Sequence, residues 1–317
     1  MRISFEIFLL VAEELSISRA SRRAFVTQQC VSDHIKRLER EYQVTLFERK
    51  PKLHLTSAGK VMQENLRNIQ IIERSMNANL HSISSGEEGA FTMGISTSRA
   101  SVILPSVLKE YYALYPKVKI SFCIEDTHFL EEKLKSGEID TFIGINTTPH
   151  PDFEISTLAI DEVMLIISSS LLRSYFTDSE IQHMLCDGVD MNRFTEVPFT
   201  LSFTNGKVNS VIQEYLDYND LRLNVIYNCS DSETQILLCA TGICASLCPR
   251  MLLSTAYRHN MTSSENDRLY MLPLRGLNRP LHVDFVTHKR LVQPAFMVNF
   301  KKILTSKMLE LSENAQL

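Results

Sequence analysis

The chain has 317 residues, of which 44% are hydrophobic and 22% charged, a composition typical of a soluble globular protein rather than a disordered or fibrous one. This length exceeds what one compact core usually holds and indicates two or three domains. The longest apolar run near the start, residues 7–12, is far shorter than a bilayer span, so we expect no signal peptide, no membrane anchor and a cytoplasmic location. Seven cysteines without a CxxC pair favour reduced thiols, and neither a metal nor a cofactor is expected.

The charge is divided unevenly along the chain. Residues 1–60 hold 11 Lys and Arg against 7 Asp and Glu, a net charge of +4, whereas the other 257 residues hold 22 against 30, a net charge of −8. A basic head on an acidic body favours contact between the head alone and a polyanion such as DNA. A net charge of +4 in sixty residues arises about equally well by chance. The motifs within residues 1–60 are therefore needed to show whether this segment contacts DNA.

Two helices are expected at the start of the basic head. Apolar residues at helical spacing predict a first helix over residues 4–15, with one buried stripe. Ser18 is expected to cap a short second helix over residues 19–24, because its hydroxyl can accept an unpaired amide of the first turn. Phe25 and Val26 then form an apolar turn.

A third helix over residues 28–42 has the pattern of a DNA-recognition helix. Thr27 is expected to cap it, and Val31, Ile35 and Leu38 fall on one face, toward the core. The opposite face is polar and presents Gln28, Gln29, Ser32, Asp33, Lys36 and Arg37. Two helices joined by a tight turn, the second polar outward at its leading end, are how a recognition helix enters the major groove.

Residues 46–59 predict a basic hairpin, because two short strand-like runs flank Lys50, Pro51 and Lys52. This hairpin is interpreted as a wing whose cations lie along phosphates or in the minor groove. The residues expected to contact DNA are Ser18, Arg19, Thr27, Gln28, Gln29, Ser32, Asp33, Lys36, Arg37, Arg49, Lys50, Lys52 and His54.

The segment SISRASRRAFVTQQCVSDHIKRLEREYQVTLFERKPKLHLTSAGK, residues 16–60, resembles the signature of the LysR-type transcriptional regulators. The resemblance includes the Thr27-Gln28 start of the recognition helix, the Leu38-Glu39 pair, LFER and LTSAG. It departs at Gln29 and Cys30, where the family usually has Pro-Ala, and at Asp33, where a basic or amide side chain is usual. Asp33 would repel phosphate unless it accepts a hydrogen bond from a cytosine amine.

Residues 58–84 contain no proline and predict a long linker helix. Steps of four and three relate Met62, Leu66, Ile69, Met76, Leu80 and Ile83, with Glu73 in the one missing place. This heptad seam predicts a dimer contact, in which Glu73 either fixes the register or shifts the contact onto Ile72. An amphipathic helix packed on its own domain is the alternative. The sequence SSGEEG, residues 84–89, marks a hinge.

From residue 89 onward the pattern alternates between strands and helices, which predicts a mainly parallel sheet with helices on both faces. Crossovers near Ile167 and Leu269 divide this part into two α/β lobes, residues 89–167 with 269–317, and residues 168–268. It resembles the periplasmic-binding-protein-like effector domain of the same family. The expected organisation is an all-α winged helix-turn-helix at 1–60, a linker helix and hinge at 61–88, and an effector-binding domain at 89–317.

Polar residues that follow predicted strands point to an effector site between the lobes, because helix N-termini at that edge aim amides inward. The candidates are Ser96, Thr97, Ser98, Arg99, Thr127, His128, Asn146, Ser202 and Thr204. They suit a small anion, with Arg99 as its charge partner. The alternatives are that the hydroxyls are ordinary helix caps and that Arg99 is a solvated surface residue.

The sequence therefore predicts a sequence-specific transcription regulator that binds double-stranded DNA and is controlled by a small effector. The resemblance implies a homodimer that assembles further into a tetramer, and RNA polymerase as a further candidate partner. An enzyme is not expected, because GxGxxG, Walker A, HExxH and GxSxG motifs are absent from the sequence. A thiol-based redox regulator of the same architecture remains the alternative, through Cys239, Cys244 and Cys248, although their apolar neighbours favour buried, inert thiols.

Overall fold

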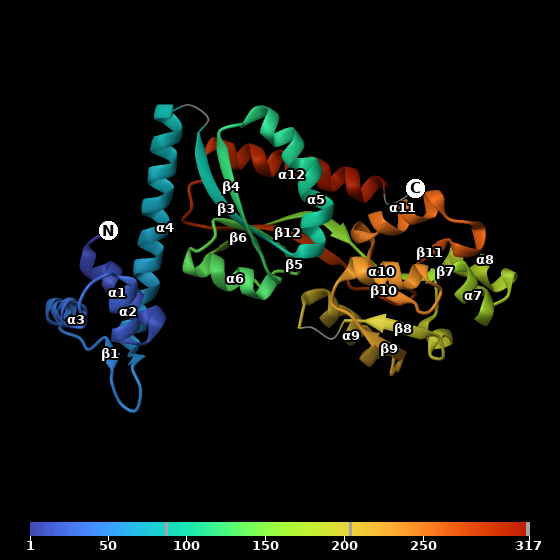
Figure 1. The fold of residues 1–317 in the computed structure, drawn as a ribbon, viewed down its shortest axis with the longest axis horizontal. Helices are drawn as coiled ribbons and strands as arrows, with labels where there is room; N and C mark the ends of the chain where they lie inside the picture. The colour runs from blue at the N-terminus through green and yellow to red at the C-terminus, as the bar shows by residue number, and fades with distance from the viewer. Residues whose placement is uncertain (86–87, 203–204, 315–317) are drawn as a thin grey trace. The chain divides into compact units, whose positions relative to one another are not determined.

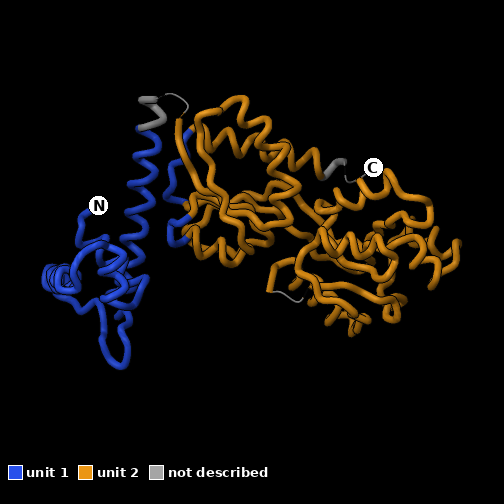
Figure 2. Tube along the Cα trace, viewed as in Figure 1, with its two compact units in different colours: residues 1–86, 135–138, 289–294 blue, residues 87–134, 139–288, 295–317 orange. Residues whose placement is uncertain are grey.

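The computed structural model describes residues 1–85, 88–202 and 205–314, without the side chains of 81–85 and 312–314. It contains two compact units, which Figure 2 distinguishes by colour. One holds residues 1–86, 135–138 and 289–294, and the other holds the remainder of the chain. The predicted hinge at 84–89 and the side chain of Ile83 therefore lie partly or wholly outside the described residues.

The first unit contains the three predicted helices and the predicted hairpin (Figure 1). Its elements are α1 (Ile3–Glu14), α2 (Ile17–Arg23), α3 (Gln28–Tyr42), β1 (Phe47–Glu48), β2 (His54–Leu55) and α4 (Ser57–Ser85). Phe8, Val31 and Leu38 are fully buried at the centre of one apolar core. The helical periodicity of the sequence thus identified the buried face of α3 correctly. The buried face of α1 is wider than one stripe, since Ile7 and Val11 are also buried, and Leu15 is exposed.

The predicted cap of α2 is wrong by two residues. Ser16, not Ser18, has the extended backbone of an N-cap, and its hydroxyl accepts a hydrogen bond from the Arg19 amide at 3.3 Å. The chain reverses quickly because Leu15 ends α1 in the left-handed conformation, so α2 begins already at Ile17. Ser18 consequently lies inside the first turn.

Three residues of the family-like motifs hold the wing in place. A carboxylate oxygen of Glu39 accepts the Leu46 amide at 2.8 Å, where the chain leaves α3 for β1. The Thr56 hydroxyl accepts the Gly59 amide at 3.0 Å at the start of α4. A Cβ atom at Gly59 would lie 2.2 Å from the Leu46 carbonyl oxygen, so this close approach requires glycine.

One face of α4 belongs to the winged-helix core. Leu66 is only 4% exposed and packs there together with Met62, so the predicted seam is wrong at these two positions. Farther along the helix, the Ser75 hydroxyl exchanges hydrogen bonds with the backbone of Val292 at 2.9 and 3.0 Å. The predicted seam residues Ile69, Met76 and Leu80 are exposed. Together with Val61 and with Ile72, the alternative to Glu73, they form an open apolar stripe whose side chains are 45–60% exposed.

The second unit contains two lobes, and lobe I is built on a five-stranded sheet of order β4-β3-β5-β12-β6. The strands are β3 (Gly89–Ile95), β4 (Val118–Ile124), β5 (Thr141–Ile145), β6 (Phe153–Asp161) and β12 (Leu281–His288). Strands β4, β3 and β5 are parallel, and β12 is antiparallel to both of its neighbours. Helices α5 (Thr97–Leu114) and α12 (Ala295–Asn314) pack together, with Phe300 edge-on against both Phe91 and Tyr111. Helix α6 (Thr127–Ser136) packs through Leu130 on Phe142.

Lobe II contains a three-stranded sheet of order β10-β7-β11 and the parallel pair β8-β9. Its strands are β7 (Val163–Ser168), β8 (Pro198–Leu201), β9 (Asn224–Asn228), β10 (Ser246–Pro249) and β11 (Leu269–Pro273). Its helices are α7 (Ser169–Tyr175), α8 (Asp178–Asp187), α9 (Lys207–Tyr218), α10 (Ser232–Ala240) and α11 (Ser254–Thr262), with 3-10 turns at Met191–Phe194, Arg250–Leu252 and Glu265–Asp267.

The prediction of a mainly parallel sheet is wrong for β12 in lobe I and for β7 in lobe II, because each pairs antiparallel with both of its neighbours. The chain enters lobe II along β7 and returns toward lobe I along β11, so these two neighbours run in opposite directions. The chain passes between the sheets at Glu162 and again over residues 274–280, a few residues from the predicted crossovers. The sequence pattern predicts a helix over residues 102–115, whereas α5 begins already at Thr97. It predicts neither strand β6 nor helices α7, α8 and α11.

Candidate DNA-binding surface and effector cavity

Helix α3 turns a polar face to solvent. The Thr27 hydroxyl accepts the Cys30 amide at 3.2 Å, which caps the helix as predicted. Of the predicted contact residues here, Ser32 is half-buried and the others are exposed: Thr27, Gln28, Gln29, Asp33, Lys36 and Arg37. Because Val31, Ile35 and Leu38 fill the opposite face, the leading end of α3 is free to approach a base edge.

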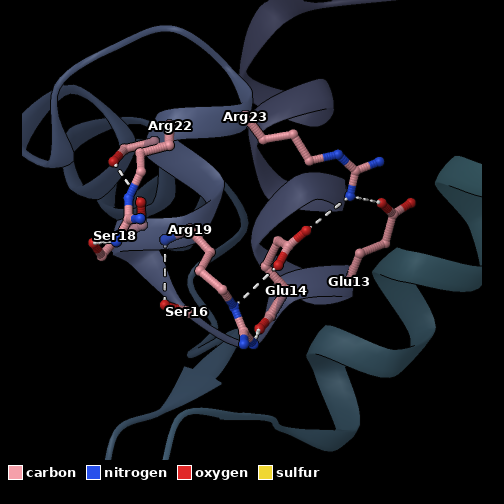
Figure 3. Close-up of polar contacts among 8 residues, drawn as sticks. Glu13, Glu14, Ser16, Ser18, Arg19, Arg22 and Arg23 are labelled. Atoms are coloured by element: carbon pink, nitrogen blue, oxygen red, sulfur yellow. Dashed lines mark hydrogen bonds and ion pairs between the residues drawn. The ribbon is translucent and has the colours of Figure 1, made fainter.

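Arginines of α2 are tied to neighbouring residues (Figure 3). Arg19 pairs with Glu14 at 3.1 Å, and Arg23 pairs with Glu13 at 2.8 Å. Arg22, which the sequence had not singled out, donates to the Ser18 hydroxyl at 3.3 Å. The charge of Arg19 is thus balanced within the domain, and its pairing joins α1 to α2.

The hairpin between β1 and β2 carries the predicted wing cations. Arg49, Lys50 and Lys52 are exposed. His54 lies 3.0 Å from a carboxylate oxygen of Glu48 through Nε2 and 2.9 Å from the Lys52 carbonyl through Nδ1. Its imidazole therefore contacts the hairpin itself, whereas Arg49, Lys50 and Lys52 are the wing cations that face solvent.

A cavity of about 120 Å³ lies between the two lobes of the second unit. Four helices begin at its wall, α5 and α6 from lobe I and α9 and α10 from lobe II. Its polar lining consists of Ser96, Ser98, Arg99, Asp126, Thr127, Ser202, Lys207, Asn209, Ser230, Ser232 and Gln235. Unpaired amides and partial positive charge at helix N-termini favour an anion at such a place.

Arg99 is a wall residue of the cavity and not a solvated surface residue, because it is only 4% exposed. Its Nη2 lies 3.6 Å from Oδ2 of Asp161, and among the described residues Nε and Nη2 of Arg99 and Oδ2 of Asp161 have no hydrogen-bond partner. Burial lowers the pKa of Arg99 and raises the pKa of Asp161, each opposed by attraction to the other. Within the part of the chain that the structure describes, the guanidinium therefore has buried N–H groups without a hydrogen-bond partner, and a carboxylate lies close to them.

The structure brings together only part of the predicted effector set. Ser96, Ser98, Arg99, Thr127 and Ser202 line the cavity, and Thr97 lines a neighbouring pocket with Ser98. His128 and Asn146 lie outside the cavity wall, and Thr204 lies outside the described residues. The Asn146 side chain accepts the His282 amide at 2.8 Å, which closes the end of the β5–β12 pair.

Lys207 is a cavity residue that the sequence analysis missed. Its ammonium donates to the Thr148 hydroxyl at 2.8 Å and lies 4.0 Å from a carboxylate oxygen of Glu131. The same oxygen of Glu131 accepts the Thr148 amide at 2.7 Å. Because Lys207 starts α9 in lobe II and its partners belong to lobe I, these contacts connect the lobes beside the cavity. In the sequence, only Gly206 and the helix start that follows it could have indicated Lys207 as a cavity residue.

The three clustered cysteines are completely buried. Burial raises the pKa of Cys248 to about 12. A hydrogen bond with Cys244, together with burial, raises the pKa of Cys239, whereas the same hydrogen bond lowers the pKa of Cys244. A thiol that stays protonated is a poor nucleophile, so the environment of Cys239 and Cys248 suits packing better than oxidation, and Cys244 is buried beside them. Within the described part of the chain, no group of three His, Cys, Asp or Glu side chains could hold a metal ion, and no helix is long and apolar enough to cross a membrane.

The chain combines a winged helix-turn-helix with a two-lobed α/β domain that has a cavity between its lobes. Residues 4–60 match the model of the bacterial regulatory helix-turn-helix protein, lysR family, and residues 84–308 match that of the LysR substrate binding domain. The chain belongs to the LysR family of transcriptional regulators.

Curated relatives include the HTH-type transcriptional regulator YtlI of Bacillus subtilis, 31% identical over 137 residues, which are 43% of this chain and 44% of YtlI. YusT of the same organism is 26% identical over 270 residues, 84% of this chain and 83% of that protein. The chain spans about half the length of the curated relatives that match it first.

Solved structures share the fold. Full-length LysG of Corynebacterium glutamicum with bound effector Arg has a TM-score of 0.64 at 18% identity, covering 98% of this chain and 99% of LysG. Full-length CbnR complexed with its target DNA has a TM-score of 0.56 at 18% identity, covering 96% and 98%.

Proposed function

We propose that this chain is a cytoplasmic, effector-controlled transcription regulator that binds two DNA half-sites as a homodimer. The observation that carries the proposal is one chain that combines an exposed polar recognition helix, α3, with a cavity at which four helices begin. A dimer matches the two-fold symmetry of paired half-sites. We further propose that the homodimer assembles into a tetramer and that the protein contacts RNA polymerase.

The DNA contacts divide into two roles. Gln28, Gln29, Ser32 and Lys36 on α3 read bases, whereas Arg49, Lys50 and Lys52 in the wing neutralise phosphates. Arg19 and Ser18 act chiefly by holding α2, because Arg19 is engaged by Glu14 and Ser18 receives the Arg22 side chain.

Replacing Lys52 with alanine is expected to weaken binding to specific and random duplexes alike. Loss of one phosphate contact should flatten the slope of log affinity against log salt by about 0.9. Fluorescence anisotropy over a salt series measures this slope. Lys109→Ala, which removes an exposed lysine of the second unit, serves as the matched control and should leave it unchanged. A Lys52→Ala protein with the wild-type slope would place the wing away from the phosphates.

The effector is proposed to be a small anion. Four helix N-termini and the Lys207 ammonium at the cavity wall favour negative charge in the cavity, and hydroxyls such as Ser98 supply directional hydrogen bonds. An anion that draws Lys207 toward the cavity would compete with Thr148 and Glu131 for its ammonium. Binding and lobe arrangement are thereby coupled, and a coupling of this kind is typically worth about 1–3 kcal/mol.

Lys207→Met and Ser98→Ala are each expected to weaken binding of such an anion about tenfold, because each removes one hydrogen bond to a charged ligand. Thermal-shift screening of mono- and dicarboxylates, amino acids and inorganic phosphate would identify a ligand, and calorimetry on the full chain would measure its affinity. Lys109→Met is the control for charge removal, since Lys109 is exposed and does not line the cavity. Wild-type affinity in both cavity variants would move the effector site elsewhere.

A further inference from the structure

Two of the three residues on the recognition helix that depart from the family pattern, Gln29 and Asp33, contact each other. Gln29 and Asp33 lie one turn apart on the exposed face of α3, and Nε2 of Gln29 donates to Oδ1 of Asp33 at 2.9 Å. Their neighbours Val31 and Ile35 are buried, so both side chains stand on the polar side of the helix. The pair therefore belongs to the surface that is proposed to meet the major groove.

This contact determines which end of the Gln29 amide is presented to DNA. A carboxylate can only accept hydrogen bonds, so the end of the amide that faces Asp33 must be the nitrogen. One N–H group of Gln29 is thereby occupied. The carbonyl oxygen and the second N–H group remain, which is one acceptor beside one donor.

We propose that Asp33 is a positioning residue that orients Gln29 to read a single adenine, an inference that rests on the proposed DNA-binding function. In the major groove adenine offers a donor at N6 and an acceptor at N7, which complement the two remaining groups of the amide. Guanine offers two acceptors, O6 and N7, and would require both N–H groups of Gln29. By occupying one of them, Asp33 selects against guanine without touching a base.

The same arrangement answers the electrostatic objection to Asp33. An isolated carboxylate on this face would meet phosphates unfavourably, and a direct role would require it to accept from a cytosine amine. As the hydrogen-bond partner of Gln29, Asp33 instead orients the Gln29 amide and does not itself contact a base. Direct reading of cytosine and positioning of Gln29 give different base preferences, so they can be separated by experiment.

The test is selection of binding sites from a duplex pool with random sequence, using the full chain and the variants Gln29→Ala, Asp33→Ala, Asp33→Asn and the double alanine variant. Gln29→Ala and Asp33→Ala should both reduce the preference for adenine over guanine at the same base pair of each half-site, by roughly 5- to 150-fold for Gln29→Ala. The double variant should be no worse than Gln29→Ala, because Asp33 acts through Gln29. Asp33→Asn should retain much of the preference, since its side-chain oxygen still accepts from the amide.

Glu41→Ala is the matched control, because it removes another exposed carboxylate of α3, one that pairs with Arg2 at 2.9 Å. It should change no base preference, and unaltered thermal unfolding of every variant verifies the fold. If Asp33→Ala changed a different base pair from Gln29→Ala, or no base pair, the positioning role would be overturned while the proposed function stood. A wild-type protein that selected no motif would overturn both.

Discussion

Arg99→Ala is expected to lower the free energy of unfolding by about 3–5 kcal/mol, because it leaves the buried Asp161 carboxylate without its counter-charge. Asp161 is anchored by the amides of Glu162 and Met251 at 2.9 and 3.1 Å and cannot easily turn to solvent. Urea denaturation followed by circular dichroism measures the loss.

Two controls separate burial from the mere loss of an arginine. Arg258→Ala removes a 71%-exposed side chain that lies 3.8 Å from Glu233, and it should cost at most about 1 kcal/mol. Replacing both members of the buried pair, Arg99→Met with Asp161→Leu, should recover much of the stability lost in Arg99→Ala. A loss below about 1 kcal/mol in Arg99→Ala, similar to that in Arg258→Ala, would contradict the buried pairing.

The effect of Arg99→Ala should also depend on pH in a defined direction. Burial raises the pKa of Asp161, and attraction to Arg99 opposes that rise. A carboxyl group with a raised folded-state pKa holds its proton more tightly in the folded state, so stability falls as pH rises through the window above the ordinary Asp value. Without Arg99 the pKa of Asp161 rises further, so the pH range over which stability falls becomes wider. The stability difference between variant and wild type should therefore shrink on acidification toward about pH 4.

Disruption of the stripe on α4 is the second change with a large expected effect. Ile72→Asp together with Leu80→Asp should convert the proposed homodimer to a monomer, because both side chains are about half exposed and each carboxylate would have to be desolvated at the proposed subunit contact. Binding to a duplex with two half-sites should fall about 10²- to 10⁴-fold, since the two heads would no longer be linked. Sedimentation velocity and anisotropy measure the two effects.

The control for this prediction is Asn77→Asp, which adds the same charge to α4 at an exposed position outside the apolar stripe. Leu66→Asp does not test the dimer, because Leu66 lies in the winged-helix core and its replacement would unfold that domain. A double variant that kept wild-type mass and DNA affinity would exclude the stripe as the subunit contact.

The sequence by itself determined the winged helix-turn-helix, because the signals for it are local. Val31, Ile35 and Leu38 recur at helical spacing, and the Thr27 cap lies next to the helix that it starts. Some local signals were present but overlooked. Thr177 and Glu180 form a capping box, a sequence signal for the start of α8. Ser16, directly before Ile17, is the N-cap of α2 in place of Ser18.

Only the tertiary structure decided which apolar face of α4 is open and what Arg99 does. Leu66 and Ile69 fit one heptad pattern, yet Leu66 is covered by α1–α3 core residues and Ile69 is exposed. Arg99 is buried because Asp161, distant in sequence, provides its counter-charge, and Lys207 reaches Thr148 across the lobes. Periodicity specifies which side chains share a face, but what covers that face depends on contacts between distant segments, which no local pattern encodes.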